Sequence, residues 1–461
     1  MSLPDLFVKR MRNLLANDAD EVLSALGSEP VVSVRLNRSK WSAAVNDDPV
    51  AWATDGYYLP ERKAFTFDPL FHAGCYYVQE ASSMFLEQVV RQYVAEPSTV
   101  LDLCAAPGGK STLLRSVLPE GSLLVSNELI PTRAQVLMEN MTKWGHPDVV
   151  VTNAAPADFA SLPSLFDMIV CDVPCSGEGM FRKDPVAVAE WSEANVETCW
   201  RRSRGIVADC WPALKPGGLL VYSTCTFNTQ EDEGNVRWIC NELGAEILPV
   251  ATKEEWGITI LDDSLPAYRF FPGRTRGEGF FLAVLRKPAT QETSPSPRTY
   301  NNKGKGKRED GTVPVTCKDW IVHPEAFDWQ LDKDVVSAVH REHAAAVALL
   351  KKSLHVLSAG VEVAVFKGKD ILPTTALALS NVLCPSAFPM VEIDYQSALS
   401  FLRGEARPLP ADTPRGFVLL TYRHIPLCFA KHLGNRTNNL FPASWRIRTT
   451  HLPEKEVTVL E

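Results

Sequence analysis

The fold of this chain is decided by the stretch Thr99-Val100-Leu101-Asp102-Leu103-Cys104-Ala105-Ala106-Pro107-Gly108-Gly109-Lys110. Its first five residues form a short, mostly apolar run, which is typical of a buried parallel strand. The small residues that follow predict a tight turn, and residues 111–118 continue as a helix. Such a turn lets the backbone approach a ligand closely, because it lacks bulky side chains and the helix start offers free N–H groups. We therefore predict a ligand-binding loop at residues 104–110.

The segments on both sides of this loop repeat its strand–helix pattern. Further strands are predicted at residues 123–126, 149–152, 166–171, 219–222 and 279–285, and further helices at 132–143, 193–213 and 231–243. Regular alternation of strands and helices is typical of a doubly wound, mostly parallel sheet with helices on both faces. We therefore predict an α/β, Rossmann-like core.

Composition and pattern divide the chain into four parts. We expect a small α+β module at residues 1–75, the core at 76–287, a linker at 288–314 and an α+β domain at 315–461. The linker is rich in Pro, Ser, Asn, Gly and Lys, so it cannot bury a core and is predicted to be flexible, with an RNA-touching arm as the alternative. In the outer parts we expect helices within residues 4–27 and near 333–357, and strands at 31–36, 361–366, 417–422 and 427–430.

The composition is that of an ordinary globular protein. Of the 461 residues, 45% are hydrophobic and 22% are charged, which suffices for a sizeable core. Eleven cysteines with no Cys-x-x-Cys pair support neither a disulfide framework nor a zinc site of the usual spacing, so no metal is predicted. The N-terminus lacks the pattern of a signal peptide, and no run of about eighteen apolar residues occurs. We therefore expect a cytoplasmic protein with reduced thiols and no membrane partner.

Charge is distributed unevenly along the chain. The formal net charge is −8, but from Arg298 onward 21 basic residues stand against 17 acidic ones. The C-terminal third is thus mildly basic, whereas the first two thirds are acidic. A basic C-terminal domain is compatible with RNA binding without establishing it.

Two cysteine segments indicate chemistry at the edge of the predicted sheet. The segments Asp172-Val173-Pro174-Cys175-Ser176-Gly177-Glu178-Gly179 and Ser223-Thr224-Cys225-Thr226 each follow a short apolar run. In open α/β sheets ligands bind beyond the carboxyl ends of the strands, so two thiols and a carboxylate would converge there. A thiolate is the strongest side-chain nucleophile available near neutral pH. The alternative is that both cysteines are small buried apolar residues.

Three kinds of ligand site compete for residues 104–110. A P-loop fits Gly109-Lys110-Ser111, but Cys104 stands where that motif needs its first glycine. The dinucleotide fingerprint Gly-x-Gly-x-x-Gly is absent. The third is an S-adenosylmethionine site, in which Glu128 after the second strand would accept hydrogen bonds from the ribose hydroxyls. A solvated carboxylate at a strand end is the alternative for Glu128.

Together, the segments 103–110, 172–179 and 222–226 resemble the Nop2/Sun family of RNA cytosine-C5 methyltransferases. The resemblance covers residues 55–286, about half the chain, and the joint occurrence of three motifs makes it specific. The tail segments 433–442 and 445–448 resemble, more loosely, the PUA-like RNA-binding region of the family's bacterial F-type 16S rRNA enzymes. The resemblance implies a class I methyltransferase core, S-adenosylmethionine as cofactor and RNA as partner.

The resemblance also implies roles for individual residues. Cys225 corresponds to the nucleophile that adds to cytosine C6, and Cys175 to the cysteine that assists release of the methylated base. Asp172 corresponds to the group that holds cytosine N3, with Lys110 beside it. The implied cofactor-binding residues are Cys104, Ala105, Ala106, Pro107, Gly108, Gly109, Lys110, Glu128, Arg133, Asn153 and Asp172.

A second set of residues is expected to bind RNA. Arg182 and Lys183 follow the Asp172–Gly179 segment, and in the family such a basic pair lies beside the active site; a solvated pair is the alternative. The C-terminal candidates, interleaved with Phe441 and Trp445, are Arg436, Asn438, Asn439, Arg446 and Arg448. Arginine and aromatic groups suit phosphate contact and base stacking, although a capped loop beside a core aromatic would look the same.

One position departs from the family pattern. Where the family has an acidic residue to receive the adenine amino group, this chain has Ala155. Asn153 or Asp158 would have to replace that carboxylate, or packing alone would hold the adenine.

Four functions follow in order of support. The first is an S-adenosylmethionine-dependent cytosine-C5 methyltransferase acting on rRNA, free or in the small ribosomal subunit, as a monomer. The second is the same chemistry on tRNA, and the third an inactive RNA-binding ribosome-assembly factor that Ala155 keeps open. A P-loop NTPase is the last. In the first two, the target base must leave its stack, because C6 is unreachable in a paired helix.

Overall fold

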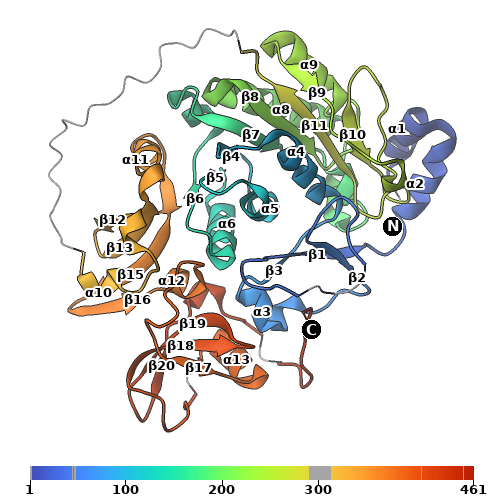
Figure 1. Ribbon diagram of the computed structural model, residues 1–461. Coiled ribbons are helices and arrows are strands. Elements are labelled where there is room, and N and C mark those ends of the chain that lie inside the picture. The colour runs from blue at the N-terminus through green and yellow to red at the C-terminus, as the bar shows by residue number, and fades with distance from the viewer. Residues whose placement is uncertain are drawn as a thin grey trace.

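The computed structural model describes residues 3–43, 45, 48–289, 313–405, 407–449 and 451–460 (Figure 1). Of the linker predicted at 288–314, all but the first two and last two residues lie outside the described residues. The described residues form four sheets. Within them, no helix combines the length and apolarity needed to cross a bilayer.

The N-terminal part combines two helices with a small antiparallel sheet. Its elements are α1 (Asp5–Leu15), α2 (Ala19–Ala25), β1 (Val32–Leu36), β2 (Gly56–Leu59), α3 (Pro69–His72) and β3 (Tyr76–Val78), with sheet order β2-β1-β3. The helices predicted within residues 4–27 and the strand at 31–36 are confirmed. Phe7 of α1 packs against Phe181, with ring centroids 4.9 Å apart, so the N-terminal helices cover the loop that follows Cys175.

The central sheet is the scaffold of the molecule. Its order is β10-β11-β8-β7-β4-β5-β6-β14, with β9 beside β11. The strands are β4 (Thr99–Asp102), β5 (Leu123–Asn127), β6 (Val149–Thr152), β7 (Phe166–Asp172), β8 (Leu214–Thr224), β9 (Glu246–Leu248), β10 (Ala267–Phe270), β11 (Phe280–Arg286) and β14 (Val356–Ala359). Strands β4 to β8 pair in parallel, so the predicted doubly wound α/β core is confirmed.

Helices cover both faces of this sheet because successive strand residues point to opposite sides. Val100 packs with α4 (Leu86–Tyr93), α5 (Gly109–Val117) and α6 (Pro131–Trp144). Leu101 packs on the other face with α8 (Glu193–Cys210) and α9 (Glu233–Leu243). The short α7 (Pro185–Glu190) precedes α8.

The region after the linker corrects one prediction. The helix expected near 333–357 is wrong in its first and last parts, because only residues 341–353 are helical, as a 3₁₀ turn at Arg341–His343 followed by α11 (Ala344–Ser353). Residues 335–340 form β13, whose valines favour a strand. It pairs on its two sides with β12 (Phe327–Asp332) and β15 (Val361–Lys367). Residues 356–359 form β14, which pairs antiparallel with β6 and extends the central sheet. The predicted boundary between core and C-terminal domain therefore does not separate the sheets.

Two further sheets complete the C-terminal part. The first contains β12 (Phe327–Asp332), β13 (Val335–His340), β15 (Val361–Lys367) and β16 (Asp370–Pro373); the second contains β17 (Met390–Glu392), β18 (Gly416–Tyr422), β19 (Ile425–His432) and β20 (Thr437–Asn439). The helices are α10 (Val315–Lys318), α11, α12 (Thr375–Leu379) and α13 (Tyr395–Leu402). Val418 and Leu420 share a core with Val34 and Leu36, so the sheet β17–β20 packs against the small N-terminal sheet (Figure 1).

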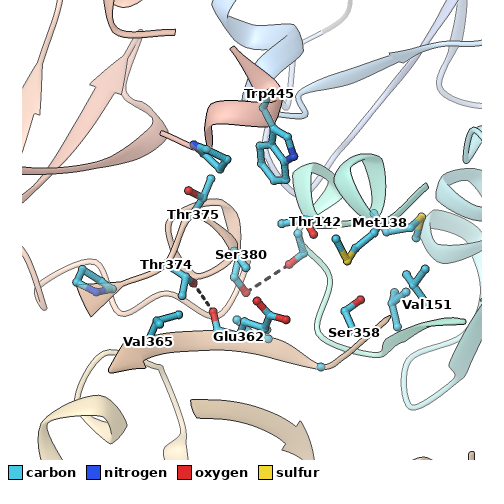
Figure 2. A pocket seen from close by; sticks show the side chains of 18 of the residues that line it. Met138, Thr142, Val151, Ser358, Glu362, Val365, Thr374, Thr375, Ser380 and Trp445 are labelled. Carbon is cyan, nitrogen blue, oxygen red and sulfur yellow. Dashed lines mark hydrogen bonds between the residues drawn. The ribbon is translucent and has the colours of Figure 1, made fainter. Parts of the chain in front are cut away.

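A cavity of about 370 Å³ lies where α6 and β6 meet the C-terminal part (Figure 2). Its wall combines apolar side chains such as Met138 and Val365 with the half-buried Glu362. Burial raises the pKa of Glu362 above its usual range. The cavity-lining residues include neither cysteine of the predicted site.

Candidate active site

The loop after β4 has the backbone of a ligand cradle. Gly108 has φ of +119°, a conformation that favours glycine, and immediately precedes α5. The start of α5 therefore carries free N–H groups beside a loop of small residues. Asn127 holds this loop against the next one, because its amide nitrogen donates to the carbonyl oxygens of Leu103 and Ala154, both at 3.0 Å. Sequence reasoning did not single out Asn127.

Asp102 ends β4 beneath this loop and is fully buried. Its Oδ2 accepts a hydrogen bond from Ser111 Oγ at 2.7 Å, whereas Oδ1 has no hydrogen-bond partner in the part of the chain that the structure describes. Burial raises the pKa of Asp102 to about 7. An open acceptor at the base of a glycine loop fits a ligand that brings a hydrogen-bond donor or a cation.

Glu128 lies beside the loop rather than in solvent. Only 4% of it is exposed, so the alternative of a solvated strand-end carboxylate is wrong. Its Oε1 accepts from the backbone N–H of Ile130 at 2.9 Å, and its Oε2 lies 3.5 Å from Arg133 Nη1. Arg133 Nη2 in turn donates to the carbonyl oxygen of Ala106 at 2.8 Å. The structure thus joins Glu128 and Arg133 to residues 104–110.

Asn153 and Asp158, the two residues expected to stand in for the acidic group that Ala155 lacks, make different contacts. Asp158 Oδ2 accepts from the Ala155 backbone N–H at 2.9 Å and caps the turn at residues 156–161. The Asn153 amide nitrogen donates to the carbonyl oxygens of Glu128 and Leu129, at 2.7 and 2.9 Å. Asn153 therefore lies beside the loop that follows β5. For receiving the adenine amino group, the geometry favours Asn153 over Asp158, whose carboxylate already caps the turn.

The two cysteines meet beyond neighbouring parallel strands. Strand β7 ends at Asp172 and β8 at Thr224, and Asp172 pairs in register with Ser223. Cys175 Sγ lies 3.3 Å from Cys225 Sγ, and the Cys225 backbone N–H donates to Cys175 Sγ at 3.3 Å. The hydrogen bond with Cys225, together with burial, raises the pKa of Cys175 well above its usual range. Cys175 is therefore a thiol at neutral pH.

Asp172 is held between two donors at the same edge. Lys110 Nζ donates to Oδ2 at 2.7 Å, and Ser223 Oγ donates to Oδ1 at 2.8 Å. Burial by itself would lower the pKa of Lys110, but the charge and hydrogen bond of Asp172 outweigh it and raise that pKa. Lys110 thus stays a cation and holds the Asp172 carboxylate at the carboxyl edge of β7 and β8.

Buried carboxylates clamp the two cysteine loops together. Glu178 Oε2 accepts from Thr226 Oγ1 and from the Phe227 N–H, both at 2.9 Å. Glu231 Oε2 accepts from the Ser176 N–H at 3.0 Å, and Ser176 Oγ is 2.9 Å from Thr226 Oγ1. These contacts run from one loop to the other and keep the sulfurs close. Sequence reasoning missed both glutamates, although Glu178 lies within the quoted motif.

A buried arginine supports the base of the Cys225 loop. Thr224 Oγ1 donates to Asp232 Oδ1 at 2.6 Å, and Asp232 Oδ2 lies 3.0 Å from Arg269 Nη1. Arg269 Nε donates to Glu233 at 2.7 Å, and its Nη1 to the Phe227 carbonyl oxygen at 2.8 Å. Burial would lower the pKa of Arg269, but the two carboxylates outweigh it and raise that pKa. No sequence motif pointed to Arg269.

Arg182 and Lys183, the basic pair after the Cys175 loop, differ in their exposure. Only 4% of the Arg182 side chain is exposed; its Nε donates to Glu278 Oε2 and its Nη2 to the Gly277 carbonyl oxygen, both at 2.8 Å. The Arg182 donors therefore face protein acceptors, and an RNA contact through Arg182 would have to replace these bonds. Lys183 is 29% exposed and lies 3.4 Å from Glu278 Oε1, so it remains a candidate.

The C-terminal RNA candidates lie on or just beyond the sheet β17–β20, apart from the cysteine loops. Arg436, Asn438 and Arg448 are exposed, whereas Arg446 is half-buried. The Asn439 amide donates to the carbonyl oxygens of Phe401 and Glu405, and Phe441 is buried. Asn439 therefore ties the sheet to α13 and the residues after it, and an RNA contact through its amide N–H groups would have to replace these bonds.

Comparison with known families matches three segments of the chain. The family described as 16S rRNA methyltransferase RsmB/F matches residues 93–286, the N-terminal domain of 16S rRNA methyltransferase RsmF matches 3–81, and the RsmF PUA domain matches 388–447. The ribosomal RNA small subunit methyltransferase F of Salmonella newport is 30% identical over 475 residues, which cover 95% of each chain. The chain belongs to the RsmB/F methyltransferase family. The corresponding protein of Pectobacterium atrosepticum is 29% identical, over 96% of this chain and 95% of its own.

Solved structures agree on the fold of this RsmB/F member. A methyltransferase homolog protein from Pyrococcus horikoshii is 25% identical, with a TM-score of 0.53 over 62% of this chain and 95% of that one. NSun6 from the same organism, solved with SFG, is 19% identical, with a TM-score of 0.52 over 62% and 98%. The predicted Nop2/Sun membership, the PUA-like region and the S-adenosylmethionine cofactor are confirmed. The PUA match begins at residue 388, so the sheet made of β12, β13, β15 and β16 lies outside it.

Proposed function

We propose that this chain methylates C5 of a cytosine in 16S rRNA through a covalent bond between Cys225 Sγ and C6 of the base. The observation that carries the proposal is the distance of 3.3 Å between Cys175 Sγ and Cys225 Sγ, beside the carboxylate of Asp172. The curated relatives are named as small-subunit rRNA methyltransferases, which favours 16S rRNA over tRNA. We therefore place the reaction at the carboxyl edge of β7 and β8, in the cytoplasm.

The chemistry needs a nucleophile because cytosine C5 is too electron-poor to attack a methyl donor unaided. The Cys225 thiolate adds to C6, and the displaced π electrons pass through C5 and C4 to N3. N3, which Asp172 faces, takes up a proton from solvent. S-adenosylmethionine, when bound, supplies the methyl group as an electrophile. A solvent base then removes the C5 proton, and the electron pair of the C5–H bond re-forms the C5=C6 bond. The C6–S bond breaks and returns its electron pair to Cys225, and N3 gives its added proton back to solvent. We assign Cys175 to assist this elimination, since it touches the departing sulfur.

The residues around the β4 loop suit the cofactor. Asp102 Oδ1 is an open buried acceptor among the described residues, and the cradle at 104–109 consists of small residues. We assign Glu128, oriented by Arg133, to the ribose hydroxyls. Asn153 lies at the edge where the adenine amino group is expected. Leu129 and Ile130 are exposed there and can pack on the ring.

RNA contacts must place the target cytosine outside its stack. We assign Lys183 to phosphate near the active site and Arg436, Asn438 and Arg448 to a more distant part of the RNA. The chain is proposed to act as a monomer, on free rRNA or on the assembled small subunit.

The test is to trap the covalent adduct. Wild-type chain, Cys175→Ala and Cys225→Ala are incubated with S-adenosylmethionine and, in separate reactions, with 16S rRNA, small subunits and tRNA. Denaturing gels then report protein–RNA bands. We expect Cys175→Ala to accumulate a band with a small-subunit substrate, because elimination is slowed. Cys225→Ala should give neither band nor methyl transfer.

Cys240→Ala serves as a matched control, because Cys240 is a half-buried cysteine on α9 away from both loops. It should behave as the wild type does. A band that survives in Cys225→Ala would overturn the assignment of the nucleophile. Transfer to tRNA alone would shift the substrate, and RNA binding without transfer by the wild type would favour an inactive assembly factor.

A further inference from the structure

A cluster of histidine and acidic side chains lies at the opposite edge of the central sheet. Asp148 immediately precedes β6, so it belongs to the core at the amino end of the parallel strands. His340 ends β13, and Glu342 and His343 form the turn before α11. The cluster therefore joins two parts of the chain that flank the linker. Neither the cofactor nor the cysteine loops involve it.

Three potential ligand atoms converge within this cluster. His343 Nε2, an oxygen of Asp148 and an oxygen of Glu342 all lie within 4.8 Å of one another. His343 Nε2 is 3.7 Å from Asp148 Oδ1 and 3.6 Å from Glu342 Oε1. These separations are too long for hydrogen bonds. They are close to the spacing of about 3.3–3.5 Å expected between ligand atoms of a tetrahedral Zn²⁺ site with bonds of about 2.0–2.2 Å.

The buried imidazole nitrogen supplies a second, independent observation. His343 is only 8% exposed, and its Nε2 has no hydrogen-bond partner among the described residues. A buried polar atom without a partner costs about 1–3 kcal/mol, so such atoms call for an explanation. Here the atom points at two carboxylate oxygens rather than at an apolar wall. A cation placed among the three atoms would satisfy all of them.

The residues around these three side chains are placed as the partners that orient metal ligands are. His340 Nδ1 lies 2.5 Å from Asp148 Oδ1 and so orients that carboxylate, as partners of ligating groups do. His146 is excluded as a ligand through Nδ1, because that atom accepts the Asp148 backbone N–H at 3.1 Å. The Glu342 side chain is 59% exposed, which provides a path from solvent and room for a water ligand.

We propose that Asp148, Glu342 and His343 bind a divalent transition-metal ion, with Zn²⁺ as the best fit. One imidazole and two carboxylates suit Zn²⁺, whereas Mg²⁺ and Ca²⁺ prefer sites made of oxygen alone. Because Asp148 comes from the core and the other two ligands follow the linker, the ion would fasten the C-terminal part to the amino edge of the central sheet. This site is separate from the methyl-transfer chemistry.

The test measures metal binding to the full-length chain without an affinity tag. The protein is stripped with a chelator, dialysed against Zn²⁺ and analysed for bound metal, and Co²⁺ is added to a second sample. We expect one Zn²⁺ per chain, a visible d–d absorption with Co²⁺ and a higher Tm with either ion. The absence of bound metal in the wild type would overturn the proposal.

Three variants locate the ion. His343→Ala removes the buried ligand, and Glu342→Gln changes an exposed ligand without disturbing packing, so it decides the matter if His343→Ala fails to fold. Each should weaken Zn²⁺ binding at least tenfold. His323→Ala is the matched control, because His323 and Glu325 form an exposed pair with atoms 3.6 Å apart. Unchanged binding in Glu342→Gln and His343→Ala, or loss in His323→Ala, would refute the site.

Discussion

The buried polar atoms at the two edges of the central sheet differ in how many of them have hydrogen-bond partners. At the carboxyl edge, Glu178 and Asp172 each accept hydrogen bonds with both oxygens, and the open Oδ1 of Asp102 lies beneath a glycine loop. At the amino edge, His343 Nε2 faces two carboxylates and finds no hydrogen-bond partner among the residues that the structure describes. The first edge is organised by its own side chains and leaves an acceptor for an organic ligand. The second leaves an imidazole nitrogen and two carboxylates that the proposed cation would join.

The largest expected effect concerns the buried charges at the carboxyl edge. Arg269→Met leaves Asp232 and Glu233 buried without their cation, which should destabilise the core by about 3–5 kcal/mol. Arg274→Met is the control, because Arg274 pairs with Asp18 near the surface and should cost about 0–1 kcal/mol. Thermal unfolding of both variants measures the difference. Equal losses would mean that this network does not hold the Cys225 loop.

Two lysine–aspartate pairs lie at opposite ends of β7. Lys110→Met should lower methyl transfer about 100-fold, because Asp172 loses the cation that orients it near the thiols. Lys215→Met removes the partner of Asp167, also at 2.7 Å but at the amino end, and should leave the rate nearly unchanged. Single-turnover transfer assays at saturating RNA separate the two. A similar loss in both variants would remove the special role of the carboxyl edge.

A smaller effect is expected from pH. Burial raises the pKa of Asp102 from 3.8 in the unfolded chain to about 7 in the folded one. The folded chain therefore keeps a proton that the unfolded chain releases, so this group makes stability fall as pH rises from about 4 to about 7. Asp102→Asn cannot ionise, and its Tm should fall less across that window than the wild-type Tm. Parallel Tm curves for the two chains would contradict the assigned pKa; Asp167→Asn, at a half-exposed site, controls for the loss of a carboxylate.

The smallest effect concerns RNA contacts. Arg448→Ala should weaken RNA binding about three- to tenfold and reduce the slope of log affinity against log salt by about 1, because one phosphate contact is lost. Arg182→Ala should leave that slope unchanged and lower the Tm instead, since its donors face Glu278 and Gly277. Filter binding at several salt concentrations distinguishes the two. The reverse result would restore Arg182 as an RNA contact.

Local patterns predicted the core well because they depend on neighbouring residues. The strand at 99–103, the glycine turn and the helix after it are confirmed almost to the residue, as β4 (Thr99–Asp102) and α5 (Gly109–Val117). The same reasoning failed at 335–340, where a run that was counted into a helix forms β13. There, pairing with β12 and β15 outweighs local propensity, and the partners lie outside the window that a pattern inspects.

The site shows the same division. Parallel strands end at one edge, so the motifs sufficed to predict that Cys175, Cys225 and Asp172 lie together, and Lys110 joins them as the resemblance implied. The motifs could not show that Arg182 is buried against Glu278, because that contact joins residues 96 positions apart. The roles of Glu231 and Arg269 likewise depend on what folds against them.

The sequence by itself determined the alternation of strands and helices, the glycine loop and the chemistry of the two cysteine segments. Each of these follows from the spacing of apolar residues and the conformations open to small residues. Only the tertiary structure decided which polar groups are satisfied. Asp148 and His340 stand 192 positions apart, yet β14 pairing with β6 brings their segments together at the amino edge. Burial and the distances between distant side chains arise only when the chain closes on itself, which no local pattern records.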